Sequence, residues 1–206
     1  MIIQDQDGKP VIGLVKSGNY MKTNRMGTAL KMLKEVENAN KSDIIKPKPL
    51  ADESVTMLTA RLKDEYNAHF FYRNAANWCQ EKGYLKAGAF FEQESANENE
   101  HALKVQKYLV DWNVYPTLPS LKPTITFNNL IDIISKAYAL EYNLYESYNS
   151  DSIKLMTTDI ATFDFLQDLR IGQRESVIEY SDLLNAAELV NVENNFEVLY
   201  FEQTYF

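Results

Sequence analysis

The amino-acid sequence predicts an all-α protein built as a four-helix bundle, with one long crossover between its second and third helices. Three observations lead to this fold class. Glycine and proline are scarce, with 7 and 6 among 206 residues, whereas the helix-favouring residues leucine, alanine, glutamate and lysine are plentiful. Four long stretches with helical patterning follow residue 50. The loops between them differ greatly in length, and this difference decides how the helices are connected.

The ends of the helical stretches are marked in the sequence. Gly83 follows the first stretch, and a connection of sixteen residues with three prolines, WNVYPTLPSLKPTITF, separates the second from the third. The last fragment, NNFEVLYFEQTYF, is expected to form a short C-terminal helix that packs through its aromatic side chains. The four long helices are expected at residues 52–80, 85–111, 128–156 and 160–186.

The loop lengths predict the topology. Very short loops join the first helix to the second and the third to the fourth, so each pair should form an antiparallel hairpin. The middle connection is long enough to travel the length of a helix, which is about 40 Å for some 27 residues at 1.5 Å per residue. The second and third helices are therefore expected to run parallel. Metal sites are common in the core of this one-crossover bundle.

Residues 1–50 are predicted to form an N-terminal extension to the bundle of residues 51–206. Apolar residues on both sides of an Asp-Gly pair at 7–8 favour a small hairpin. Apolar residues spaced along 26–36 favour a short amphipathic helix. Two prolines make residues 41–50 a linker, because they would break a helix there.

Charge is divided unevenly between these two parts. Residues 1–50 carry nine lysines and arginines against five acidic residues, a net +4, whereas residues 51–206 carry a net −12. A net +4 over fifty residues is too weak to indicate nucleic-acid binding. The extension is therefore expected to pack at subunit contacts or to dock a protein partner.

Three further features indicate the compartment. Cys79 is the only cysteine, which excludes an internal disulfide and favours a reducing environment. The start of the chain lacks the architecture of a signal peptide, and no apolar run reaches membrane-spanning length. We expect a soluble, cytoplasmic protein without membrane contact.

Each predicted helix carries a polar residue near its middle. Glu98 and His101, three positions apart, lie on one side of a helix, where they either bind one metal ion together or stand as two solvated surface residues. Mid-helix residues of a bundle meet at one level, and buried carboxylates there cost several kcal/mol each if left unpaired. Iron suits a set of carboxylates with one imidazole. The set is Glu65, Glu98 with His101, Glu141 and Gln173.

This set resembles the ferritin family over residues 55–206, because its di-iron ferroxidase pattern of Glu, Glu-x-x-His, Glu and Gln matches in order and spacing. Tyr72, seven residues after the first ligand, matches the family's tyrosine. The stretch TFDFLQDLRIGQ resembles the fourth helix of prokaryotic non-haem ferritins, and VLYFEQ resembles their terminal segment.

The resemblance implies an iron-storage protein and ferroxidase. It would oxidise Fe(II) to Fe(III) with oxygen or peroxide at an iron (di-iron) centre inside the bundle and sequester the product in a homo-oligomeric shell. The resemblance implies that Glu98 bridges both ions, that Glu65 and His101 hold the first ion, and that Glu141 holds the second. Gln173 would complete the metal site by hydrogen-bonding a bound water or oxygen species. Tyr72 would either donate an electron or stabilise a bridging oxygen group.

Three positions depart from the family pattern. Asn97 replaces the acidic residue that usually precedes the second-helix ligand, and Gly172 stands where a glutamate is expected. Ser176 occupies a position where some prokaryotic members carry a further iron-binding glutamate. No third iron site is therefore expected.

Two other functions stay open on the sequence alone. One is a di-iron oxidase or peroxidase that stores no iron. The other is a structural or partner-docking protein that keeps the bundle with reduced or lost ferroxidase activity, and Arg174 favours it because an inward-pointing cation would lower metal affinity. His69, one turn from Glu65, is either an extra ligand or an ordinary half-buried histidine.

Overall fold

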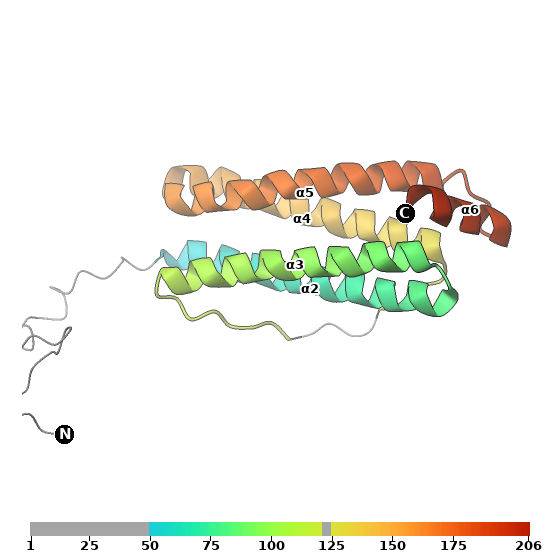
Figure 1. Cartoon of the computed structure of the whole chain (residues 1–206). Helices are drawn as coiled ribbons and strands as arrows, with labels where there is room; N and C mark the ends of the chain where they lie inside the picture. Colours follow the sequence, from blue (N-terminus) through green and yellow to red (C-terminus); the bar gives the residue numbers. More distant parts are fainter. Residues whose placement is uncertain (1–49, 121–124) are drawn as a thin grey trace, which may run out of the picture. The chain divides into compact units, whose positions relative to one another are not determined.

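The structure, a computed structural model, describes residues 50–120 and 125–206. The hairpin, the short helix and the linker expected before residue 50 lie outside the described residues. None of the described helices combines the length and the apolar character needed to span a lipid bilayer. The described residues form five helices, labelled as in Figure 1: α2 (Asp52–Lys82), α3 (Leu85–Asp111), α4 (Leu130–Thr158), α5 (Ile160–Ala187) and α6 (Asn195–Tyr205).

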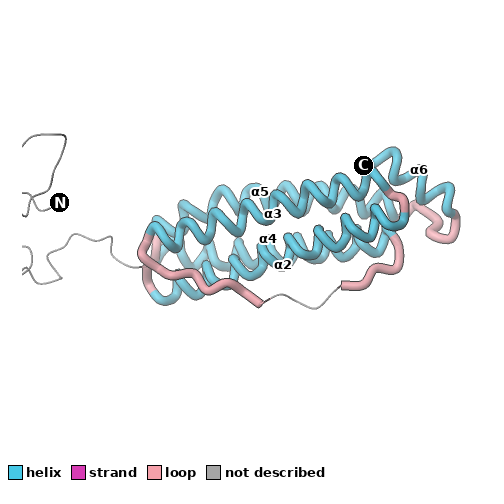
Figure 2. Tube along the Cα trace, turned by 60° about the horizontal axis from the view of Figure 1, so that its bottom comes forward, coloured by secondary structure: helices cyan, strands magenta, loops and turns pink. Residues whose placement is uncertain are grey.

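The arrangement of these helices confirms the predicted bundle. No helix end differs by more than two residues from the expected position. α2 packs against α3 and α4 packs against α5, each as an antiparallel pair, and α2 also contacts α4. α3 ends at the opposite end of the bundle from the start of α4, so these two helices run in the same direction (Figure 1). Figure 2 shows the four long helices aligned along one another, with α6 at one end.

The ends of the helices follow from local sequence. Gly83 ends α2 with a left-handed φ of 87°, a conformation that glycine adopts without strain. The side chains of Asn129 and Asp159 accept hydrogen bonds from backbone N–H groups and so cap α4 and α5. Asp159 is the single residue between α4 and α5, and it also accepts a 2.7 Å hydrogen bond from Ser54 Oγ. The α4–α5 turn is thereby tied to the start of α2.

Helix α6 is attached to the start of α3 at the other end of the bundle. Glu202 is fully buried, and its Oε1 accepts hydrogen bonds from the backbone N–H groups of Lys86 at 2.7 Å and Ala87 at 3.1 Å. The first N–H groups of a helix have no partner within the helix, and its N-terminus favours negative charge. Lys86 Nζ donates in return to the carbonyl of Gln203 at 2.7 Å. Glu202 therefore caps α3 from a distant helix.

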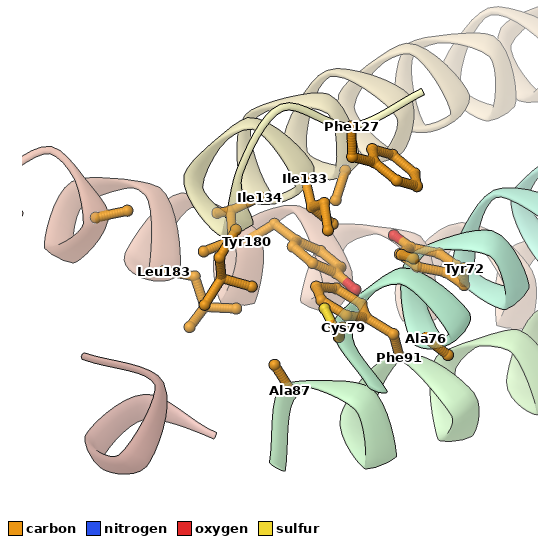
Figure 3. Packing of buried hydrophobic residues seen from close by; sticks show 14 of the residues in the cluster. Tyr72, Ala76, Cys79, Ala87, Phe91, Phe127, Ile133, Ile134, Tyr180 and Leu183 are labelled. Carbon is orange, nitrogen blue, oxygen red and sulfur yellow. The ribbon is translucent and has the colours of Figure 1, made fainter. Parts of the chain in front are cut away.

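The buried apolar side chains form two clusters separated by a polar layer. On each of the four long helices, a buried polar residue lies between the members of one cluster and those of the other, and on α3 buried Ser95 lies there as well. Figure 3 shows the cluster nearer α6, in which Tyr72 stacks on Phe91 and on Tyr180 with ring centroids 6.1 Å and 5.8 Å apart. The dividing residues are Glu65, Glu98, Glu141 and Gln173.

Replacing Glu202 by alanine tests the link between α6 and α3. The change leaves two N–H groups of α3 without their acceptor, so the free energy of unfolding in urea should fall by about 1–3 kcal/mol. Hydrogen exchange at the amides of Lys86 and Ala87 should accelerate. Glu193→Ala removes an exposed carboxylate from the segment between α5 and α6 and should change neither quantity. Unaltered exchange in Glu202→Ala would contradict the capping role.

Candidate metal centre

The polar layer holds a compact group of two carboxylates and an imidazole. Glu65 of α2 and Glu98 and His101 of α3 each offer one ligand atom, and these atoms all lie within 4.8 Å of one another. His101 Nδ1 is 3.6 Å from Glu65 Oε2 and 3.4 Å from Glu98 Oε2. Glu65 is fully buried and Glu98 is 2% exposed, whereas the side chain of His101 is 25% exposed. The group can bind one cation between α2 and α3.

A second group lies at the same level on the other helix pair. Glu141 of α4 is fully buried, and both of its carboxylate oxygens accept hydrogen bonds. Tyr72 donates its hydroxyl to Oε1, and Gln173 of α5 donates its Nε2 to Oε2 and also to the Glu141 carbonyl at 3.2 Å. Burial raises the pKa of Glu141 to about 7, although the two side-chain donors act in the opposite direction. The structure thus brings the predicted site residues together as two adjoining groups.

Burial is the largest influence on the titration of the first group. It raises the pKa of Glu98 well above its usual value, and the charge of Glu65 adds to this effect. Burial alone would lower the pKa of His101, but its interactions with the Glu65 and Glu98 carboxylates raise it to about 10. Burial would also raise the pKa of Glu65, yet the attraction of His101 holds it below its usual value. In the cation-free protein, His101 therefore carries a proton at pH 7.

Tyr148 is a contact of this site that the sequence analysis missed. Its hydroxyl donates to Glu65 Oε1, and its ring is fully buried. The other oxygen, Glu65 Oε2, is buried without a hydrogen-bond partner. A signal was present in the sequence, because Tyr148 follows Glu141 by seven residues just as Tyr72 follows Glu65.

Two residues whose roles the sequence left open, His69 and Arg174, are not part of the group formed by Glu65, Glu98 and His101. The ring Nδ1 of His69 lies 2.7 Å from the carbonyl oxygen of Ser95 and 3.0 Å from its hydroxyl. His69 is thus held by α3 and is not one of the three grouped ligands. Arg174 is exposed, so its charge does not point into the polar layer. Arg174 therefore gives no reason to expect weakened metal binding.

A cleft of about 240 Å³ between α3 and α5 is lined by Glu98 and His101. The three departures from the family pattern, Asn97, Gly172 and Ser176, also line it. Its remaining residues are acidic, and a cleft of one charge sign raises the local concentration of the opposite ion. These acidic residues are Glu94, Glu100, Glu175 and Glu179.

The residues present fit iron. Carboxylate oxygens together with an imidazole nitrogen are donors that iron accepts. Glu65 Oε2 is a buried acceptor without a hydrogen bond, and such an atom costs free energy unless a donor or a cation binds it. The layer contains three buried carboxylates, Glu65, Glu98 and Glu141, and a bound cation would offset their repulsion.

Comparison with known proteins finds similarity to ferritins. The family model of the ferritin-like domain matches residues 55–190. The bacterial non-heme ferritin of Campylobacter jejuni is 28% identical over 148 residues, which are 71% of this chain and 89% of that protein. The bacterial non-heme ferritin of Escherichia coli O6:H1 is 23% identical over 154 residues, or 74% of this chain and 92% of that one.

The fold is also similar to a solved structure. An open pore ferritin from the hyperthermophilic archaeon Archaeoglobus fulgidus superposes with a TM-score of 0.70 at 18% sequence identity. The match covers 76% of this chain and 96% of that chain. Because the family model spans well over half of the sequence, this chain belongs to the ferritin family.

Proposed function

We propose that this protein is a ferroxidase that stores iron: it binds Fe(II) as substrate in the polar layer, oxidises it with oxygen or peroxide, and sequesters Fe(III) in a homo-oligomeric shell. The observation that carries the proposal is the buried Oε2 of Glu65, which accepts no hydrogen bond and faces Glu98 and His101. Relatives named bacterial non-heme ferritins support it. The proposed compartment is the cytoplasm, and residues 1–50 are proposed to pack at subunit contacts or to dock a protein.

The proposed route of the substrate begins at the acidic cleft between α3 and α5. The cleft leads Fe(II) to Glu98 and His101, which line it. The first ion then binds Glu65 Oε2, a Glu98 oxygen and the ring nitrogen of His101, whose proton leaves. Neutral imidazole is the form that binds metal.

The second ion is proposed to bind between Glu98 and Glu141. Gln173 must first release Glu141 Oε2, because its amide occupies that oxygen. Each Fe(II) gives up one electron. Oxygen takes two electrons and two protons to form hydrogen peroxide, and peroxide takes the same numbers to form two waters. Tyr72, held on Glu141, is placed to donate an electron.

One observation favours a second candidate, a structural or partner-docking ferritin-like protein with reduced ferroxidase activity. Both oxygens of Glu141 already have hydrogen-bond donors, so the second half of the site is less open than the first. Asn97, Gly172 and Ser176 also line the cleft without contributing a carboxylate. A chain that binds only one cation would keep the fold but could not oxidise two Fe(II) ions together.

The first prediction concerns catalysis. Wild-type protein given Fe(II) without oxygen and then mixed with oxygen should form Fe(III) rapidly, as followed by near-ultraviolet absorbance. Glu98→Ala removes the ligand shared by both ions and should slow this rate by roughly 100-fold. Loss of a residue that only hydrogen-bonds a metal ligand already costs about 10–100-fold, so loss of the ligand itself is expected at the upper end of that range. Glu92 lies on α3, as Glu98 does, and Glu92→Ala breaks an exposed ion pair with Arg73 of α2. This control should leave the rate unchanged.

The amount of iron that the same preparation retains distinguishes an iron-storing ferroxidase from a di-iron oxidase and from a structural protein. After repeated additions of Fe(II), the wild-type oligomer should retain many more than two iron ions per chain on size-exclusion chromatography. Retention of two or fewer with rapid oxidation would identify a di-iron oxidase. An intact oligomer without oxygen-dependent oxidation would identify the structural candidate.

The second prediction concerns protons. His101, with a pKa raised to about 10, is protonated at pH 7 and must lose its proton when a cation binds. Binding of Co²⁺ should therefore release protons at pH 7 and tighten as pH rises from 7 to 8.5, because less work is needed to deprotonate the ring. Calorimetric titration in two buffers of different ionisation enthalpy measures the number released. His101→Ala should release at least one proton fewer, and equal heats in both buffers for the wild type would contradict the assignment.

A further inference from the structure

Helices α2 and α4 carry the same pair of residues with the same spacing. Glu65 and Tyr72 are seven positions apart on α2, and Glu141 and Tyr148 are seven apart on α4. Residues seven apart lie on nearly the same side of a helix, two turns from each other. α2 and α4 run in opposite directions (Figure 1). Each tyrosine therefore reaches the glutamate of the other helix.

The hydrogen bonds between the two helices are reciprocal. Tyr72 donates to Glu141 Oε1, and Tyr148 donates to Glu65 Oε1. The consequences differ, because Glu141 Oε2 has a second donor in Gln173 while Glu65 Oε2 has none. On the α2 side, the tyrosine occupies one oxygen and leaves the other open.

A third contact fixes the ring of Tyr148. The guanidinium of Arg61, four residues before Glu65, lies 5.9 Å from the centroid of that ring. Arg61 Nε is also 3.6 Å from Oδ2 of Asp151, three residues after Tyr148. Arg61 and Asp151 are both buried, and an attraction between a buried cation and an aromatic face restrains the ring. The α2–α4 contacts thus form three successive rungs: Tyr72–Glu141, Glu65–Tyr148 and Arg61–Asp151.

We propose that Tyr148 is a positioning residue of the metal centre: its hydroxyl holds Glu65 Oε1, so that Oε2 is the single atom that Glu65 presents toward Glu98 and His101. This inference rests on the proposed function, since it concerns the presentation of Glu65 to a cation. A carboxylate held in this way binds through one oxygen at a set position. A carboxylate released from Tyr148 can rotate and bind through both oxygens, which changes the coordination geometry.

The test uses Co²⁺, which reports its coordination through its visible d–d spectrum and needs no oxygen. Tyr148→Phe keeps the ring and removes only the hydroxyl. It should weaken binding of the first Co²⁺ by about 10–100-fold and alter the spectrum at saturation. Tyr180→Phe is the matched control, because Tyr180 is just as buried (Figure 3) and its hydroxyl bonds none of the proposed ligands. This control should match the wild type in both measurements.

The outcomes separate the possibilities. Wild-type affinity and spectrum in Tyr148→Phe would overturn the positioning role while the proposed function stands. A lower melting temperature of the cation-free variant with an unchanged saturated spectrum would show a merely structural role and also overturn it. Wild-type protein that binds no Co²⁺, or that Glu98→Ala matches in affinity, would remove the proposed function and this inference with it.

A structure of the Co²⁺-loaded wild type decides the matter if Tyr148→Phe fails to fold. Glu65 bound through Oε2 alone, with Tyr148 still on Oε1, would support the proposal. Glu65 bound through Oε1 or through both oxygens would overturn it.

Discussion

Burial of three carboxylates in one layer of an otherwise apolar bundle is the constraint on which the rest of the structure depends. Glu65, Glu98 and Glu141 are each at most 2% exposed, and like charges so placed repel one another. The protein offsets this with a protonated His101 on one side and hydroxyl and amide donors on the other. A buried charged layer is a weak source of stability, because desolvation of the charges can exceed what their partners return. Under the proposed function, the binding of cations accounts for its presence.

The remainder of the fold supplies the stability that this layer lacks. Apolar clusters lie on both sides of it along the bundle. Asp159 ties the α4–α5 turn to α2 at one end, and Glu202 ties α6 to α3 at the other. These contacts connect helices that are distant in sequence, so they keep the four polar residues in register. A shift of one helix by a turn would move its ligand by about 5 Å and separate the group.

Much of this architecture could be predicted from the sequence because its determinants are local. Glycine and proline mark the helix ends, and a mid-helix position sets the level at which Glu65 and Glu98 meet. The role of Tyr148 could not be assigned in the same way, since an aromatic residue at helical spacing is equally typical of an apolar core. Glu202 was also missed as a cap, because its partners are backbone groups on a helix far away in the sequence. Which oxygen of a carboxylate stays open depends on such tertiary contacts and not on spacing.

The most direct measurement of the central claim is X-ray diffraction at the iron absorption edge from crystals soaked with Fe(II) in the absence of oxygen. We expect an anomalous peak within coordination distance of Glu65 Oε2, a Glu98 oxygen and a ring nitrogen of His101. A second, weaker peak is expected between Glu98 and Glu141. Iron bound only elsewhere on the chain, with this layer free of anomalous density, would contradict the account.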